Sequence, residues 1–412
     1  MPQVQPPLNF LAPDFQPWVL RLAQLGLPIL RRSQFDLSQI EAENLDRLVR
    51  LYDRFQKGEI RLMLAFRHPN PKDPICLAHL VWKLLPQAAR AQNVALRSPS
   101  HFHFIYDRGI PLWAGSVVEW LFPKLGGTPI QRGKLDLMGL RSARNLFANG
   151  EFPLAAAPEG GTNGHNEIVS PLEPGIAQMA FWCVEDLRDA GRSEEVVILP
   201  LGIRYSYLNA PWTQVDALLD RLEAQMQLEP LAKSNAKGDR YDRLYRLGGQ
   251  LLVVMERFYR DSYHRPFPKE IHFPESNEEL AVRVQTLLDE ALNVAEEYFG
   301  IKPRGTVIDR CRRLEQAGWN RIYRQEFEKP DRISPLERGL ADRVAEEASL
   351  RMWHMRLVEH FVAVSGSYVR ENPSVDRFAD TAILMWKTFE QIQGDTQPSP
   401  HLGAQNVCLT VG

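Results

Sequence analysis

The sequence has few cysteines and no long apolar run. Its four cysteines are widely spaced among 412 residues and form no C-x-x-C pair, so we expect neither a disulfide framework nor a cysteine-rich zinc site. No stretch reaches the roughly 18 uninterrupted apolar residues that a membrane-spanning helix needs. The first residues, MPQVQPPLNF, lack the basic and apolar regions of a secretory signal. We therefore expect a protein of the reducing cytoplasm that is soluble or peripheral on the cytoplasmic face of a membrane.

The chain also lacks a large excess of charge of either sign. It has 49 Lys and Arg against 51 Asp and Glu, for a formal net charge of −2, whereas nucleic-acid-binding proteins usually carry a basic excess. We therefore expect no nucleic-acid partner. The charge is nevertheless uneven, because residues 61–150 hold 12 Lys and Arg against 4 Asp and Glu. A basic stretch of this kind would attract phosphorylated acceptors, a phosphopantetheine carrier or an anionic bilayer surface.

From about residue 61 to residue 210, short β-like runs alternate with helical segments. This alternation predicts an α/β fold with a mixed, mostly parallel sheet flanked by helices. The apolar run VVILPLGI indicates a strand that is covered on both faces. The predicted strands cover residues 61–67, 101–106, 128–132, 152–158 and 196–205, and the predicted helices cover residues 74–90, 113–124, 135–149 and 173–190.

The segments on either side of this region are predicted to be helical. The N-terminal segment contains a second helical stretch over residues 37–55. Capping boxes at Ser276 and Ser334 begin two C-terminal helices, the first of which ends at Gly300. The predicted domains are an N-terminal helical segment with a membrane-surface contact in one reading (1–60), the α/β domain (61–210), a helical C-terminal region (211–395) and a loose polar tail (396–412).

The first chemical motif is a histidine that follows a predicted strand, with an aspartate five residues later. His68 leaves the end of the strand RLMLAFR, and Asp73 precedes Pro74 at a predicted helix start. If the loop between them folds back, the carboxylate accepts a hydrogen bond from the imidazole and fixes its tautomer. The other ring nitrogen then becomes a base that activates a substrate hydroxyl. Alternatively, the pattern is only a surface loop before a capped helix.

Three further motifs follow in order. Arg132 ends a short predicted strand, where a guanidinium can face a phosphate. The turn APEGGTNG, residues 157–164, follows an apolar strand and contains three glycines, which let backbone amides approach an anion. Pro200 interrupts an apolar strand, although proline is rare in a central strand.

Taken together, the ordered motifs resemble those of the glycerolipid acyltransferase superfamily, which includes glycerol-3-phosphate and lysophosphatidic acid acyltransferases. The resemblance covers roughly residues 60–210. His68 and Asp73 match the H-x4-D motif of that superfamily, and the other matches are Pro129-Ile-Gln-Arg132 to the second block, Pro158-Glu159-Gly160 with Gly175 to the third and Pro200 to the fourth.

The resemblance implies an O-acyltransferase of phospholipid biosynthesis. His68 would remove a proton from the acceptor hydroxyl, and Asp73 would orient the imidazole. The donor would be acyl-CoA or acyl-carrier protein, and the acceptor glycerol-3-phosphate or a lysophospholipid such as lysophosphatidic acid. The chemistry requires no cofactor and no metal.

Two positions depart from the pattern of the superfamily. Arg67 stands before the histidine, where asparagine is usual, and the third block lacks its arginine. Candidates to replace that arginine at the acceptor phosphate are Arg67, Lys72 and Lys134, unless the acceptor is not a simple glycerol phosphate. The predicted acceptor-binding residues are therefore Arg132, Glu159, Gly160, Gly161 and Thr162, together with Arg67 and Lys134.

Three alternatives remain open from the sequence. His101 and His103 alternate with phenylalanines on a predicted strand, and with His68, His165 or Asp73 they would suit a metallohydrolase. The fold could also serve as a catalytically silent module that binds acyl chains or lipids.

The third alternative concerns the N-terminal helix. Residues 17–30 are apolar, begin near Trp18 and are followed by two arginines, which suits a segment in a membrane interface. The other interpretation is a helix packed on the domain and interrupted at Pro28.

Overall fold

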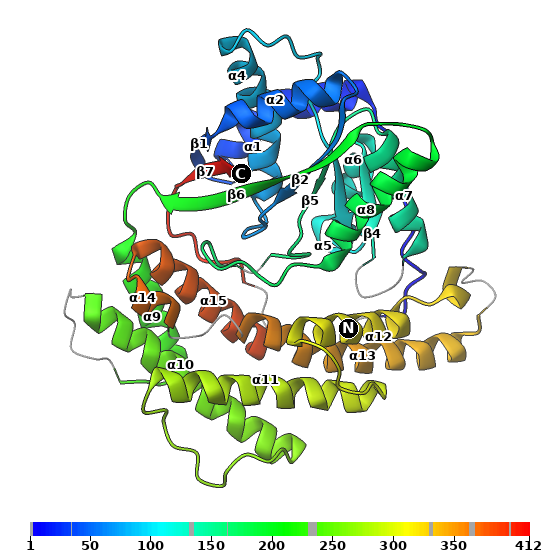
Figure 1. Cartoon of the computed structure of the whole chain (residues 1–412). Coiled ribbons are helices and arrows are strands. Elements are labelled where there is room, and N and C mark those ends of the chain that lie inside the picture. The colour runs from blue at the N-terminus through cyan, green and yellow to red at the C-terminus, as the bar shows by residue number, and fades with distance from the viewer. Residues whose placement is uncertain are drawn as a thin grey trace. The chain divides into compact units, whose positions relative to one another are not determined.

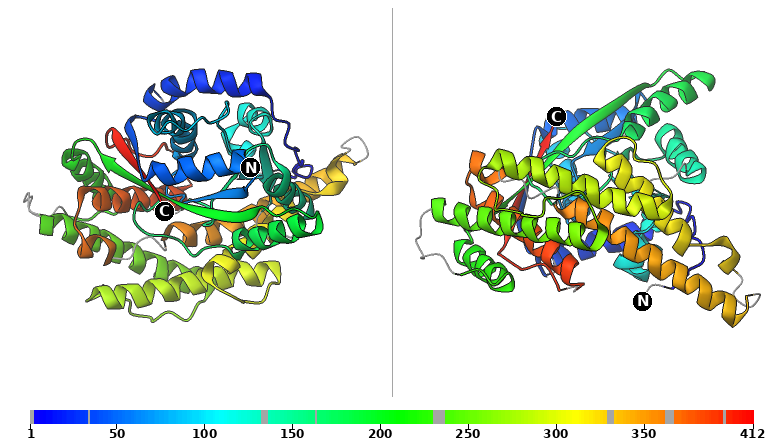
Figure 2. Two further views of the ribbon diagram at one scale, coloured as in Figure 1. Left: turned by 45° about the horizontal axis from the view of Figure 1, so that its top comes forward. Right: turned by 90° about the horizontal axis from the view of Figure 1, so that it is seen from below.

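The chain forms two compact units (Figures 1 and 2). Unit 1 is helical, and unit 2 contains the sheet together with the predicted His–Asp pair. Unit 1 consists of Met1–Pro7 and Ala210–Leu402, and unit 2 consists of Leu8–Asn209 and Gly403–Gly412. The structure, a computed structural model, describes residues 3–33, 35–131, 136–162, 164–229, 237–328, 333–361, 367–394 and 397–412.

Unit 2 is built around a seven-stranded mixed sheet of order β1-β7-β6-β2-β5-β3-β4. Each neighbouring pair of strands is parallel except β6 and β7, which are antiparallel. The predicted α/β class with a mostly parallel sheet is therefore confirmed. The strands are β1 (Leu37–Glu43), β2 (Ile60–Phe66), β3 (His103–Asp107), β4 (Gly127–Ile130), β5 (Leu154–Ala156), β6 (Glu195–Tyr207) and β7 (Gln405–Val411).

Helices cover both faces of the sheet, and alternate residues of β2 point to the two faces. Leu62 and Leu64 pack in one apolar core with α2, α3 and α4. Met63, between them, packs on the opposite face with α7 and α8. The helices of unit 2 are α1 (Pro17–Ser33), α2 (Leu45–Gln56), α3 (Asp73–His79), α4 (Leu85–Ala91), α5 (Ile110–Ala114), α6 (Ser116–Lys124), α7 (Leu137–Asn149) and α8 (Pro174–Asp189), with a π-helical turn, η1 (Leu80–Leu84), between α3 and α4.

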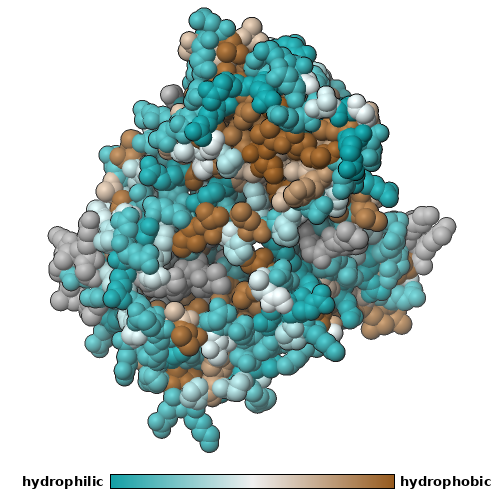
Figure 3. All heavy atoms as spheres, in the orientation of Figure 1, coloured by the Kyte–Doolittle hydropathy of each residue, from teal (hydrophilic) through white to brown (hydrophobic). Residues whose placement is uncertain are grey.

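Strand β6 differs from the prediction that both of its faces are covered. Leu199 and Leu201 are buried, but Ile198 is 39% exposed and Pro200 is exposed. Hydrophobic side chains gather over this part of unit 2, near β6 and α8 (Figure 3). The apolar run VVILPLGI is therefore not buried on both faces, because Ile198 and Pro200 are exposed.

Pro200 is accommodated where the β6–β7 ladder ends. Its carbonyl oxygen accepts a hydrogen bond from the Gly412 amide, and the last register pair of the ladder is Leu201 with Val411. The N and C=O groups of Pro200 therefore face β7. Those of the next residue, Leu201, face β2, where the Leu201 carbonyl accepts a hydrogen bond from the Arg67 amide. The missing N–H of Pro200 falls at the end of the ladder and leaves the β2 pairing intact.

Two terminal predictions were wrong. Residues 37–43 form β1 instead of the start of a helix, and the predicted tail, residues 396–412, contains β7. The two strands pair in parallel with each other, so each depends on a partner more than 350 residues away in the chain. In β7, Val407, Leu409 and Val411 are buried at alternate positions, which places one face of the strand in the core.

Helix α1 packs against unit 2 and also exposes an apolar stripe. It runs through Pro28 without ending there, and Val19 and Leu20 are buried in a cluster with Leu125. Figure 2 shows α1 on the outside of α3–α4. Among the described residues, no helix is both long enough and apolar enough to cross a bilayer. The outward stripe consists of Trp18, Leu22, Leu25 and Ile29, which are 52%, 58%, 75% and 69% exposed.

Unit 1 confirms the predicted helical C-terminal region. The Ser276 hydroxyl accepts from the Glu279 amide, and Gly300 ends the same helix in the left-handed conformation at φ 69°. The predicted capping box at Ser276 is only half formed, because the Glu279 carboxylate accepts from the Glu275 amide. The Ser334 capping box is complete, since Ser334 and Glu337 each accept from the other's amide. The described helices are α9 (Trp212–Gln225), α10 (Lys237–Tyr263), α11 (Asn277–Phe299), α12 (Val307–Ile322), α13 (Pro335–Phe361), α14 (Ser367–Glu371) and α15 (Val375–Gln393), with a 3₁₀ turn, η2 (Gln325–Glu328).

Candidate active site

His68 and Asp73 meet at the carboxyl end of β2, as their spacing predicts. His68 lies two residues beyond the strand, and Asp73 is the first residue of α3. Nδ1 of His68 lies 2.8 Å from Oδ2 of Asp73, and the amide of Asn70 donates to the same oxygen at 3.0 Å. The short loop therefore folds back and brings the imidazole and the carboxylate into direct contact.

The geometry fixes the tautomer of the imidazole. A carboxylate only accepts hydrogen bonds, so Nδ1 of His68 carries the proton and Nε2 has the free lone pair of the neutral ring. The Asp73 side chain is fully buried, whereas that of His68 is 23% exposed. Nε2 makes no hydrogen bond to a residue that the structure describes. A base can thus face a substrate while its partner stays away from water.

The sequence did not indicate a third member of this group, Tyr205 of β6. Its hydroxyl donates to Oδ1 of Asp73 at 2.5 Å, and the Cys76 sulfur lies 3.4 Å from the same hydroxyl. Burial raises the pKa of Tyr205 well above its ordinary value and that of the Cys76 thiol to about 12. Both groups therefore remain protonated at neutral pH, and Tyr205 remains a hydrogen-bond donor to Asp73.

The electrostatics of Asp73 are set by opposing effects. Burial raises the pKa of the carboxyl group, and the hydrogen bonds from His68, Tyr205 and Asn70 act against that rise. An ionised Asp73 is thus stabilised by three donors in place of water. The same donors orient the carboxylate toward His68.

Glu159 lies against the backbone of His68. Its side chain is almost completely buried, one oxygen accepts from the His68 amide at 2.9 Å, and the other accepts from the Ser170 amide at 2.8 Å. We predicted that Glu159 would contact the acceptor. The structure gives it a different role, because both of its oxygens hold backbone amides around His68.

Arg67 also differs from its predicted role as a phosphate ligand. Its Nη1 donates to the Asn166 carbonyl at 2.5 Å, and its Nη2 donates to the His165 and Ile168 carbonyls at 2.9 and 2.6 Å. Its Nε lies 3.5 Å from Glu159. The guanidinium therefore fastens the segment 165–168 beside the histidine, because carbonyl groups of that segment occupy the donors that a phosphate would need.

The glycine-rich turn lies beside the histidine loop. Gly160 has φ 69°, which a residue with a side chain rarely adopts, and the Gly164 amide donates to the Pro69 carbonyl at 3.2 Å. Gly161 is half-buried and Thr162 is exposed. The amides of both donate to no described residue. This turn thus leaves two N–H groups without a described acceptor in a segment that is bonded to the histidine loop, and its use as an anion-binding turn stays a prediction.

The cations predicted for the second block, Arg132 and Lys134, lie outside the described residues. Gln131 and Asp136, the described residues on either side of them, are joined by a hydrogen bond of 2.9 Å from the Gln131 amide to the Asp136 carboxylate. The Arg108 guanidinium also donates to Asp136, which caps α7 by accepting from the Gly139 amide.

His103 is the first residue of β3 and His101 lies two residues before the strand. Both imidazoles are engaged with other protein groups. Trp82 donates to Nδ1 of His101, so the proton of this neutral ring lies on Nε2 and is donated to the Leu125 carbonyl at 2.8 Å. Burial lowers the pKa of His101 to about 4. His103 bonds the Gly126 carbonyl at 3.0 Å. In the part of the chain that the structure describes, no three His, Cys, Asp or Glu side chains are placed to hold a metal ion.

Comparisons with known proteins identify no relative of this chain. None of the family models matches it, and neither a curated protein nor a solved structure does.

Proposed function

We propose that unit 2 is an O-acyltransferase that moves a fatty acyl group from a thioester to a hydroxyl. The observation that carries this proposal is the 2.8 Å contact between His68 Nδ1 and the fully buried Asp73 carboxylate. It leaves Nε2 as a base, with no nucleophilic side chain among the described contacts of His68. The resemblance to glycerolipid acyltransferases supports the same reaction.

The proposed reaction uses His68 as both base and acid. Nε2 takes the proton of the acceptor hydroxyl while the hydroxyl oxygen attacks the thioester carbonyl. The resulting tetrahedral oxyanion collapses, the carbon–sulfur bond breaks, and the imidazolium returns the proton to the thiolate. Products are an ester and a free thiol. Asp73 stabilises the imidazolium while the proton is held there, as the acidic member of a catalytic triad does.

The acceptor we propose is glycerol-3-phosphate or a lysophospholipid. Supporting features are the amides of Gly161 and Thr162, which face no described acceptor, and the basic stretch that contains Arg132 and Lys134. Acyl-CoA or acyl-carrier protein would supply the acyl group. No metal or cofactor takes part in the scheme. We further propose that the sheet and its helices are of the glycerol-3-phosphate acyltransferase type and that the protein works at the cytoplasmic face of a membrane.

A transfer assay tests this function. Labelled acyl-CoA and acyl-carrier protein are each offered with a panel of hydroxyl acceptors that includes glycerol-3-phosphate and lysophosphatidic acid. The variant His68→Ala should lower turnover by about a thousandfold. His272→Ala is the matched control, since this imidazole is exposed in unit 1, and it should keep full activity.

Two outcomes would contradict the proposal. Full activity of His68→Ala would remove the base, and absence of transfer to every acceptor would favour a lipid-binding module. Metal analysis addresses the metallohydrolase alternative, because stoichiometric zinc or manganese with chelator-sensitive activity would favour it.

A further inference from the structure

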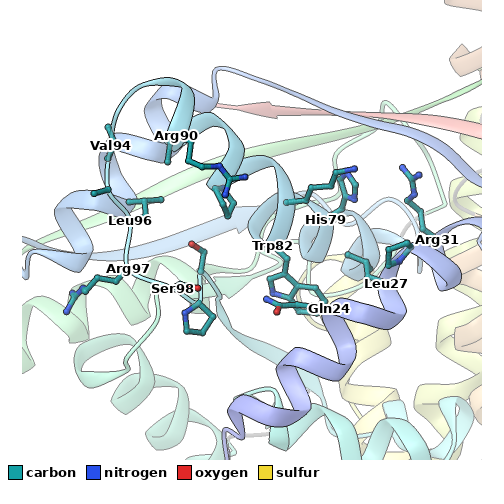
Figure 4. A pocket seen from close by; sticks show the side chains of 17 residues that line it. Gln24, Leu27, Arg31, His79, Trp82, Arg90, Val94, Leu96, Arg97 and Ser98 are labelled. Carbon is teal, nitrogen blue, oxygen red and sulfur yellow. The ribbon is translucent and has the colours of Figure 1, made fainter.

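A cavity of about 640 Å³ lies in unit 2 between α1, the helical stretch α3–η1–α4 and the segment 94–100 (Figure 4). Neither His68 nor Asp73 lines it. Its volume falls within the range of small-molecule binding sites. The cavity is therefore a candidate binding site that the proposed transfer reaction does not use.

The charged side chains around this cavity are all cations. No Asp or Glu is among its described lining residues. Such an enclosure of one sign raises the local concentration of oppositely charged ligands. The cations are Arg31 of α1, Lys83 of η1, Arg90 of α4 and Arg97 of the segment 94–100.

The continuous helical stretch presents part of this charge along one side. His79, Lys83 and Arg90 all line the cavity, so the stretch turns these three side chains toward it. Lys83 and Arg90 form no ion pair or side-chain hydrogen bond with a described residue. In Figure 4, Arg90 lies toward the end near Arg97, whereas His79 lies toward the end near Arg31. Positive groups thus occupy both ends of the cavity.

The middle of the cavity combines apolar walls with one buried imidazole. Leu27 and Trp82 lie between the two charged ends in Figure 4. The His79 residue is 6% exposed, and its ring makes no hydrogen bond to a described residue. Burial, with repulsion from Arg31 and Lys83, lowers the pKa of His79 to about 4. At neutral pH the ring is therefore neutral and offers one N–H and one lone pair toward the cavity.

We propose that this cavity binds a phosphate-bearing ligand with at least two anionic groups, one held by Lys83 and the other by Arg90. Arginine and lysine are the usual phosphate partners in proteins, and guanidinium groups can bind phosphate oxygens in pairs. Anionic groups at the two ends would leave the less polar part of the ligand against Leu27 and Trp82. A phospholipid headgroup with two phosphates and a soluble diphosphate both present this chemistry.

Binding measurements on the full-length chain test the proposal without any transfer assay. One arm measures pyrophosphate binding by equilibrium dialysis. The other measures co-sedimentation with vesicles of phosphatidylcholine that contain cardiolipin, whose headgroup carries two phosphates. The double variant Lys83→Gln/Arg90→Gln should weaken binding in at least one arm by tenfold or more. The matched control is Arg47→Gln/Arg188→Gln, which removes the same charge from exposed positions of unit 2 outside the cavity.

The outcomes distinguish a lipid ligand from a soluble one. They also distinguish binding in the cavity from a general effect of positive charge. Loss in the vesicle arm alone identifies a lipid headgroup, and loss in the pyrophosphate arm alone identifies a soluble phosphate. Lys83→Arg/Arg90→Lys keeps both charges and should retain binding. The proposal is overturned if the wild type binds neither probe. It is also overturned if the cavity variant loses no more affinity than the control pair.

Discussion

The hydroxyl of Tyr205 donates a hydrogen bond of 2.5 Å to Oδ1 of Asp73 and thereby joins β6 to the first residue of α3. Oδ2 of the same carboxylate faces His68. Each oxygen of Asp73 therefore has its own partner, and the orientation of the imidazole depends on a residue of a different strand. Tyr205 acts through Asp73 and is a positioning residue.

Replacing Tyr205 by Phe removes the hydroxyl and keeps the ring. We expect a loss of about 1 kcal/mol in the free energy of unfolding. We also expect turnover to fall by roughly fivefold to tenfold, because Asp73 loses one of the bonds that orient it. Tyr52→Phe is the matched control, since the Tyr52 hydroxyl is also buried and bonds to the backbone of His101.

Chemical denaturation and the transfer assay check this prediction together. The two variants should lose similar stability, but only Tyr205→Phe should lose turnover. Equal turnover in both variants would show that the Tyr205 hydroxyl is merely structural.

The pH dependence of stability offers a second test of Asp73. Burial raises its folded-state pKa above the ordinary value of 3.8, so between these two values the folded state binds more protons than the unfolded state. The contribution of Asp73 to the free energy of unfolding therefore falls as pH rises from 3.8 through the folded pKa, and it is constant above that.

Asp73→Asn lacks this titration. Relative to the wild type, its stability should increase as pH rises through that interval and then remain level. Denaturant titrations of both proteins at a series of pH values measure the difference. A difference that moves in the opposite direction would mean that the donors around Asp73 outweigh its burial.

The central sheet could be predicted from the sequence because each βα segment carries its own signal. The strand at 60–66 and the helix after Asp73 are marked by an apolar run and by Pro74. Strand β1 has no comparable local mark, since it is paired with β7 at the other end of the chain. The alternation in QNVCLTV, residues 405–411, was a usable signal for β7.

The candidate site could likewise be predicted only in part, because some of its contacts join residues close in the sequence and others join distant segments. His68 and Asp73 are five residues apart, so a short loop is sufficient to bring them together. Tyr205 reaches Asp73 only because β6 lies beside β2 in one register, with Leu201 opposite Phe66. The Arg67 guanidinium donates to carbonyls of a segment about 100 residues later in the sequence. Because the sequence does not reveal these contacts, Arg67 was predicted to be free to bind a phosphate.

A substitution of Arg67 distinguishes a structural role of this residue from a role in substrate binding. Arg67→Ala removes its bonds to the carbonyls of the segment 165–168, and we expect a loss of about 2 kcal/mol in the free energy of unfolding. Arg188→Ala, at a position where the side chain is 76% exposed, should change stability by less than about 0.5 kcal/mol.

The acceptor dependence of the transfer reaction provides the second readout. A phosphate ligand would raise KM for phosphorylated acceptors alone. A residue that fastens the loop beside His68 should instead lower turnover with every acceptor. A selective rise in KM without loss of stability would restore the sequence-based role of Arg67.

Helix α1 allows a sharper test of membrane contact than its deletion. Removing residues 1–33 would also remove the buried Val19 and Leu20, so lost flotation would not distinguish an anchor from a damaged unit 2. The variant Leu22→Ser/Leu25→Ser/Ile29→Ser changes only side chains that are more than half exposed.

If the stripe enters a bilayer, this triple variant should bind anionic liposomes less tightly, by about 2 kcal/mol or more of binding free energy. The reason is that the wild type transfers three apolar side chains from water into the bilayer and the variant does not. Its melting temperature should stay near that of the wild type. Val282→Ser/Leu336→Ser/Leu350→Ser is the matched control, since these exposed side chains lie on helices of unit 1. Equal flotation of the α1 variant, the control and the wild type would leave the exposed stripe without a membrane role.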